Sequence, residues 1–228
     1  SFGNLDTTFF PGTGFNKRVF ALAIQSDGKI LAGGEFGAYN GDSAKGVIRL
    51  NMDGTRDTSF ITNLGTGAAW VNAIKIQTDG KIIIGGNFTS YNGVNAGCIA
   101  RLNTDGSLDS TFNTGSGIGI YPYSAIYTLA LQPNGKIIAG GFFRFFDSLL
   151  LPVHSIIRIN TDGSRDTTFG KYGFWGGSST DEVLTIDLQQ DGKIIVGGGF
   201  DKCDSVIANS LARLDTNGVL DTTFITGL

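Results

Sequence analysis

Four stretches of the chain alternate between large apolar side chains and smaller or polar ones. They cover residues 19–24, 71–76, 126–131 and 183–188. The large apolar positions are Leu22 and Ile24, Ile74 and Ile76, Leu129 and Leu131, and Ile186 and Leu188. The alternate positions begin β-branched and turn small or polar, as in Val19, Ala21 and Ala23. Because side chains alternate across a strand, this period of two residues predicts four strands with two different faces.

A second run follows each of these strands and has the pattern K-I-[LI]-[AIV]-G-G-x-F. It begins at Lys29, Lys81, Lys136 and Lys193. Both faces of this run are apolar or glycine, which is typical of a strand that is covered on both sides. The glycine pairs would let neighbouring backbones approach closely. A helical period of 3.6 residues persists nowhere in the chain, so we expect an all-β fold.

Three sequence anchors recur along the chain. D/N-G-K-I and R-[LI]-[ND] occur four times each, at intervals of 52 to 57 residues, and D-[ST]-[ST]-F occurs five times. Each unit reads as four short antiparallel strands, which is the pattern of one β-propeller blade. We therefore expect a single array over residues 1–228, with units at approximately 10–60, 61–112, 113–169 and 170–224. Residues 1–9, which carry the extra D-[ST]-[ST]-F, would complete a preceding blade.

The turns predict the register of each second hairpin. Asn51-Met52-Asp53-Gly54 has the signature of a type I turn followed by a left-handed glycine. With this loop, Arg49 lies opposite Asp57 on the same face of the hairpin. The same counting pairs Arg101 with Asp109, Arg158 with Asp166 and Arg213 with Asp221. These pairs could be ligand clamps, but they recur in every unit and we interpret them as structural ion pairs.

The repeated motifs resemble a known family. The run V-x-A-[LI]-x-[IL]-Q-x-D-G-K-I-[LI]-x-G-G-x-F, followed by R-L-N-x-D-G-x-x-D-[ST]-[ST]-F, is similar to the delta-60 repeat, a bacterial and phage propeller repeat. The resemblance covers nearly the whole chain. It implies a β-propeller in an extracellular, cell-surface or virion-associated setting, and it implies no catalytic residues. The third unit departs from the pattern over residues 142–154, where the Y-N-G of the first two units is missing.

Composition excludes several classes of protein. Of 228 residues, 41% are hydrophobic and 16% are charged, which excludes disorder. The net charge of −3 supplies no basic surface for nucleic acid. The sequence has no apolar run near 18 residues and no signal peptide, so we expect no membrane span. Because the chain opens at Ser1 and its one methionine is Met52, we expect a processed product or an excised segment.

The five copies of D-[ST]-[ST]-F bear on ring closure. A ring closed by strand exchange needs one terminus to supply the last outer strand, but the fourth unit already has its own copy at Asp221. We therefore expect the four units to be part of a larger ring. Further units of a parent chain, or a second copy joined head to tail into eight blades, would complete it. The alternative is a compact four-bladed ring in which the N-terminal strand is unpaired or displaces another.

Function is expected on the face that carries the long fourth-to-first connections. Aromatic residues collect in these connections and are candidate ligand contacts: Trp70, Tyr121, Tyr123, Tyr172, Phe174 and Trp175. The alternative is that they fill the gaps between blades, as most aromatic residues pack in cores. Loops on a rigid scaffold are common binding sites. We therefore expect a non-catalytic module that binds a carbohydrate or a protein.

Other candidate chemistry is sparse. The N-x-D-G-x-x-D segments resemble part of a calcium loop, but the hairpin explains every residue without a metal. His154 is the only histidine and has no matched base or nucleophile at a fixed spacing, and Cys98 and Cys203 fall at different repeat positions. We expect no metal, cofactor or disulfide. The alternative function is a propeller hydrolase or lyase with carboxylates at the channel mouth, for which Asp187 is the one candidate.

Overall fold

The computed structural model describes residues 4, 6–62, 69–118, 124–146, 149–152, 154–170, 173–175 and 181–224. Every regular element in these ranges is a β-strand. No helix in the described part of the chain is long and apolar enough to cross a membrane. The all-β fold predicted from the alternating stretches is confirmed, and all four of those stretches are strands.

Each unit forms a three-stranded antiparallel sheet with its first, second and third strands in spatial order. We number these sheets as blades 1 to 4. Their strands are β1 (Val19–Ile24), β2 (Ile30–Gly34) and β5 (Val47–Leu50); β6 (Trp70–Ile76), β7 (Ile82–Asn87) and β10 (Ile99–Leu102); β11 (Ala125–Leu131), β12 (Ile137–Phe142) and β15 (Ile156–Ile159); β17 (Glu182–Leu188), β18 (Ile194–Gly199) and β21 (Leu211–Leu214).

The predicted fourth strand is shorter than expected. In blade 1 it consists of one isolated bridge, Leu50 to Arg56, and the other blades have the equivalent bridge. The reason is the aspartate that follows. Asp57 Oδ1 accepts hydrogen bonds from the backbone N and the Oγ of Ser59 at 3.0 and 2.6 Å, which turns the chain out of the extended conformation. The fourth strand of each blade is thus a single bridged residue followed by a turn.

Small hairpins occupy the connections between second and third strands. They are β3 (Ala38–Tyr39) with β4 (Asp42–Ser43), β8 (Ser90–Tyr91) with β9 (Val94–Asn95), β13 (Phe145–Phe146) with β14 (Leu149–Pro152), and β19 (Lys202–Cys203) with β20 (Val206–Ile207); β19 also pairs with β16 (Phe174–Trp175). In blade 1, Asn40 and Gly41 both have positive φ, at 51° and 86°, as a two-residue hairpin turn requires. Blade 3 forms its hairpin without the Y-N-G motif.

A β-bulge in the first strand changes the predicted faces. The pairing of β6 with β7 shifts between Val71 and Ala73, and the first strands of the other three blades shift at the same place. Because the bulge adds one residue, Val71 lies on the same face as Ile74 and not on the face of Ala73. The strict alternation read from the sequence is therefore wrong at this first position of each strand.

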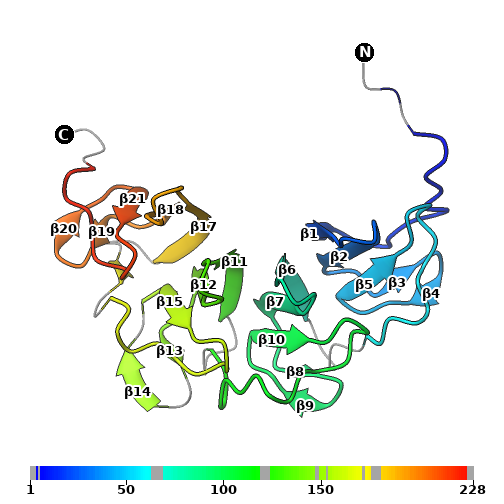
Figure 1. The fold of residues 1–228 in the computed structure, drawn as a ribbon, viewed down its shortest axis with the longest axis horizontal. Helices are drawn as coiled ribbons and strands as arrows, with labels where there is room; N and C mark the ends of the chain where they lie inside the picture. The colour runs from blue at the N-terminus through cyan, green and yellow to red at the C-terminus, as the bar shows by residue number, and fades with distance from the viewer. Residues whose placement is uncertain are drawn as a thin grey trace.

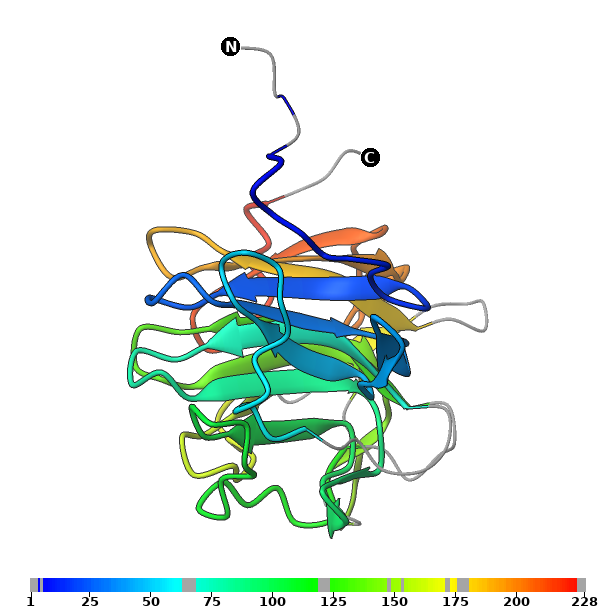
Figure 2. The same ribbon diagram turned by 90° about the vertical axis from the view of Figure 1, so that its right-hand side faces the viewer.

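The four blades stand side by side in an open arc (Figure 1). The first strands β1, β6, β11 and β17 lie along its inner side, and blades 1 and 4 lie at the two sides of the opening. Seen from the side, the sheets stack face against face (Figure 2). The compact four-bladed ring is thus wrong for this chain, because blade 1 does not meet blade 4.

Candidate functional site

The second hairpin of each blade has the register predicted from its turn. In blade 1, Asn51 N donates to Thr55 O at 2.8 Å, and Asp57 N donates to Arg49 O at 3.0 Å. Arg and Asp therefore face each other, and the structure contains all four ion pairs. The Nε to Oδ2 distances are 2.8 Å for Arg49–Asp57, 2.7 Å for Arg101–Asp109, 2.7 Å for Arg158–Asp166 and 3.0 Å for Arg213–Asp221.

Each aspartate has a second cationic partner that the turn pattern did not predict. The lysine of the D/N-G-K-I anchor places its Nζ on the same aspartate Oδ2. The distances are 2.7 Å for Lys29–Asp57, 2.8 Å for Lys81–Asp109, 2.6 Å for Lys136–Asp166 and 2.9 Å for Lys193–Asp221. The signal was present, because this lysine recurs in every unit. Its partner lies 28 to 30 residues away on a different hairpin, and only the pairing of second and third strands brings the two together.

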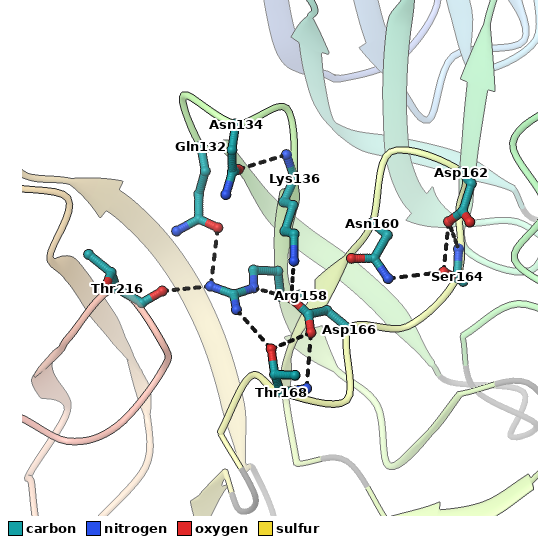
Figure 3. Close-up of polar contacts among 10 residues, drawn as sticks. All are labelled: Gln132, Asn134, Lys136, Arg158, Asn160, Asp162, Ser164, Asp166, Thr168 and Thr216. Atoms are coloured by element: carbon teal, nitrogen blue, oxygen red, sulfur yellow. Dashed lines mark hydrogen bonds and ion pairs between the residues drawn. The ribbon is translucent and has the colours of Figure 1, made fainter.

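The arginine also joins its blade to the next one (Figure 3). Arg158 uses all three nitrogens: Nε donates to Asp166, Nη2 to Thr168 Oγ1 at 3.4 Å, and Nη1 to the carbonyl oxygen of Thr216 at 2.6 Å. Thr216 belongs to the turn of blade 4. The guanidinium also lies over the ring of Phe169, 4.8 Å from its centroid. Arg49 and Arg101 make the equivalent bonds to Thr104 O at 2.5 Å and Thr161 O at 2.6 Å.

In this arrangement the recurring carboxylates have a structural role. Burial by itself would raise the pKa of Asp109, but hydrogen bonds from Lys81, Thr111 and Arg101 outweigh it and hold the pKa well below its usual range. Asp57 and Asp166 behave in the same way. A carboxylate that stays ionised and has both oxygens occupied is a poor general acid or base. The residues that recur most strongly in the sequence therefore hold blades together.

The structure describes only part of the candidate ligand face. Tyr121, Tyr123 and Tyr172 lie outside the described residues. Trp70 is half-buried at the start of β6 in blade 2, and Phe174 and Trp175 form β16 beside blade 4. Phe174 is buried and packs against Phe200 with ring centroids 4.3 Å apart. Phe174 is therefore a core residue, as the alternative interpretation of these aromatics has it.

Strand β16 and Trp70 are not neighbours in the fold. They flank different blades, with blade 3 between them. Trp70 begins β6 directly after one fourth-to-first connection, and β16 lies within another. Antiparallel order puts these connections on the face opposite the tight glycine hairpins. Among the described residues, these candidates therefore do not form one cluster.

The remaining candidates lie apart from one another. Cys98 and Cys203 are both buried and free, and burial raises the pKa of each thiol to about 12. Burial lowers the pKa of His154, and the positive charge of Arg144 lowers it further. The side chain of Asp187 is exposed on β17, and the equivalent residues of the other blades are Ala23, Lys75 and Ala130. Within the described ranges, no three His, Cys, Asp or Glu side chains form a group that could hold a metal ion.

Together, the four-fold repetition of sheets and the arginine bonds between them define a β-propeller repeat array. The family model described as "Domain of unknown function (DUF5122) beta-propeller" matches residues 25–60, 77–112, 132–169 and 189–224. These four matches cover more than half of the chain, and the chain belongs to this family. Each match ends at the phenylalanine that lies under the arginine of its blade. No curated protein that was compared with the chain matches it.

Solved structures are similar to the chain at low sequence identity. A catalytically inactive virginiamycin B lyase from Staphylococcus aureus, solved with quinupristin, has a TM-score of 0.50 and 17% identity over 89% of this chain and 54% of its own. A protein of unknown function from Bacteroides caccae has a TM-score of 0.46 and 15% identity over 91% and 69%. PorZ, a surface component of the type-IX secretion system of Porphyromonas gingivalis, has a TM-score of 0.45 and 12% identity over 95% and 29%. The chain thus spans about half of the lyase and under a third of PorZ.

Proposed function

We propose that this chain is a non-catalytic propeller module that binds a carbohydrate or protein ligand through the face of its long fourth-to-first connections. One observation supports the proposal most. The carboxylates that recur in all four blades are each held by an arginine and a lysine of the framework, so the repeat itself supplies a scaffold and no acid–base pair. What varies between units is the length of the connections on one face. Variable loops on a rigid scaffold are where ligand contacts usually occur.

The setting we propose is extracellular, at the cell surface or on a virion. The support is the resemblance of the repeat to the delta-60 repeat, which occurs in bacterial and phage propellers. Expressing the chain in its native host and assaying its location in fractionated cells would test this setting. Retention of the native protein in the cytosol would contradict it.

The binding proposal is tested with the folded chain on a glycan array and in pull-downs from surface extracts. Trp70→Ala removes an aromatic from the proposed face, and Met52→Ala removes an exposed apolar side chain from a tight hairpin on the opposite face. We expect a bound glycan or protein to be weakened at least tenfold by Trp70→Ala and unchanged by Met52→Ala. Two empty screens with a folded sample, or equal losses in both variants, would contradict the proposal.

A propeller hydrolase or lyase is the alternative, and the observation behind it is the exposed carboxylate of Asp187 on an inner strand. The equivalent positions of the other blades carry no second acid, whereas a two-carboxylate mechanism needs one. Any turnover found with polysaccharide substrates should be abolished by Asp187→Asn if this alternative is correct.

A further inference from the structure

The two end faces of the array expose apolar side chains that the internal junctions cover. Leu22 on β1 is 66% exposed, although its equivalents in the other three blades are buried. Those equivalents are Ile74 at 5%, Leu129 at 1% and Ile186 at 8%. Each of the three is covered by the blade that precedes it in the chain. Blade 1 has the same side chain, and no blade among the described residues covers it.

The opposite end of the array also exposes a side chain that is buried in the other blades. Leu211 on β21 is 38% exposed, whereas its equivalents in blades 1 to 3, which the following blade covers, are buried. Those equivalents are Val47, Ile99 and Ile156. Arg213 is also more exposed than the other three arginines of the network.

A glycine on the second strand shows how the two faces fit together inside the array. A Cβ on Gly33 would lie 2.7 Å from Val71 Cγ1 and 3.0 Å from Ile74 Cδ1 of the next blade. The next blade therefore inserts a β-branched residue and a second large residue into the space that the missing side chain leaves.

The same fit recurs at the other two internal junctions and ends at blade 4. Gly85 receives Ile126 and Leu129, and Gly140 receives Val183 and Ile186. Gly197 is the fourth member of the series, and the atoms nearest to a Cβ there belong to Thr185 and Ser210 of its own blade. The side chains that would fill this space, by their place in the repeat, are Val19 and Leu22.

The hydrogen bond that joins neighbouring blades is likewise split between the two ends: blade 4 has the arginine donor, and blade 1 has the carbonyl acceptor. Arg213 Nε and Nη2 make their bonds within blade 4, to Asp221 at 3.0 Å and to Thr223 at 3.4 Å. In the other blades Nη1 donates to a backbone carbonyl in the turn of the next blade. The equivalent carbonyl of blade 1 belongs to Met52, in a turn at the far end of the array.

We propose that a second copy of this chain docks head to tail on these faces, so that two junctions close one ring of eight blades. Blade 1 of each copy would seat Val19 and Leu22 against Gly197 and Leu211 of the other. Arg213 of one copy would donate to the Met52 carbonyl of the other. A second copy is the occupant we favour because both halves of the junction are on this chain and lie at the two sides of one opening (Figure 1). A twofold-related copy engages both at once.

The N-terminal segment adds a specific requirement to this docking. Phe10 N donates to Asp53 O at 2.7 Å, as Ile61 N donates to Asp105 O at 2.8 Å at the next junction. The ring of Phe9 lies against Gly54 as that of Phe60 lies against Gly106. Residues 6–10 therefore occupy, on blade 1, the place that the end of a preceding blade takes.

Two identical segments would compete for that place in the dimer. Residues 5–9 and 220–224 both read L-D-T-T-F. Asp6 is already folded as Asp221 is, since it accepts Thr8 N and Thr8 Oγ1 at 2.9 and 2.6 Å. At each junction of the ring, Arg213 and Lys193 of one copy pair either with Asp221 of the same copy or with Asp6 of the other copy. The segment that does not pair is displaced.

Sedimentation velocity at rising protein concentration tests the docking. We expect a dimer of twice 24.0 kDa for the wild type. Leu22→Glu and Leu211→Lys should each be folded monomers by circular dichroism and sedimentation. Val94→Glu, which puts the same charge at an exposed position on the outer hairpin β9, should leave the dimer unchanged.

A mixing experiment tests which faces meet. An equal mixture of the Leu22→Glu and Leu211→Lys chains should restore the dimer, because one junction then pairs Glu with Lys and the other is wild type. A wild-type monomer, an oligomer larger than a dimer, a dimer that survives Leu22→Glu, or a mixture that stays monomeric would each overturn the proposal.

The exchange of the two identical segments has its own test. Asp6→Asn and Asp221→Asn should each keep the dimer, because the other segment can pair with Arg213. The double variant should weaken dimerisation by at least tenfold. If it dimerises as tightly as the wild type, neither segment closes the junction and this part of the proposal is wrong.

Discussion

The junction between blades 2 and 3 and the two ends of the array are built from the same repeat but differ in what covers them. At the junction, Leu129 is buried against Gly85, and Arg101 reaches Thr161 of the next blade at 2.6 Å. At the ends, the equivalent Leu22 is exposed, and Arg213 makes its described bonds within its own blade. A blade is therefore an incomplete unit whose stability comes from its neighbours, as in other repeat proteins.

Acid should weaken every blade, because each blade relies on an ionised aspartate. The folded-state pKa values of Asp57, Asp109 and Asp166 lie well below the value of about 3.9 in an unfolded chain. The unfolded chain therefore binds protons first as the pH falls. The stability that these groups contribute is fully present above about pH 4 to 5 and is lost progressively below it.

Urea unfolding at a series of pH values measures this loss. We expect the free energy of unfolding to fall steadily between about pH 5 and pH 2, and to fall less steeply in Asp109→Asn. A flat profile over this range would show that the carboxylates are not paired in solution.

Removing an internal arginine should have the next largest effect. Arg101→Ala loses the bond to the Thr161 carbonyl and the contact with the ring of Phe112, while Asp109 keeps Lys81 at 2.8 Å. We expect a loss of about 2 to 3 kcal/mol in the free energy of unfolding. Arg213→Ala, at the end of the array, should cost clearly less when both variants are measured in a Leu22→Glu background that keeps the chain monomeric. Equal losses in the two variants would show that the bond between blades contributes nothing.

The glycine of the second strand offers a smaller and sharper comparison. A Cβ at Gly85 would lie 2.6 Å from Ile126 Cγ2 of the next blade, whereas the nearest atom to one at Gly197 is Thr185 Cγ2 of its own blade, at 2.9 Å. Gly85→Ala should therefore cost about 1 to 3 kcal/mol. Gly197→Ala should cost less than about 1 kcal/mol, because rotation of the threonine relieves the contact.

Dimerisation would cover the open face at Gly197 and change its measured loss, so the comparison needs monomeric chains. Both glycine variants are best measured in a Leu22→Glu background, which keeps the chain monomeric under the proposed docking. The reverse order of the two losses would contradict the assignment of Gly197 to an open face.

Local chemistry allowed much of this fold to be read from the sequence. The Asp-Gly turn fixes the number of residues in the second hairpin, and the recurrence of Arg49 and Asp57 in every unit then fixes which residues face each other. The alternating first strand and the apolar second strand likewise follow from burial on one or both faces.

The features that were missed depend on contacts distant in sequence. The bulge before Ala73 lets both Val71 and Ile74 reach Gly33 of the preceding blade, and no local pattern requires it. The lysine that joins each ion pair is brought there by strand pairing. Phe174 was a candidate ligand contact with core packing as the alternative, and the sequence could not decide between them, because aromatic residues in a loop and in a core look alike.

The most direct test places the same charge at two equivalent positions, Leu129 and Leu22. Leu129→Glu should fail to fold, because it puts a carboxylate into the covered junction between blades 2 and 3. Leu22→Glu should fold, with a circular dichroism spectrum and a melting temperature close to those of dilute wild-type chain, because that face is open in a single copy. If both variants fold equally well, or if both fail to fold, the contrast between internal and terminal faces is wrong.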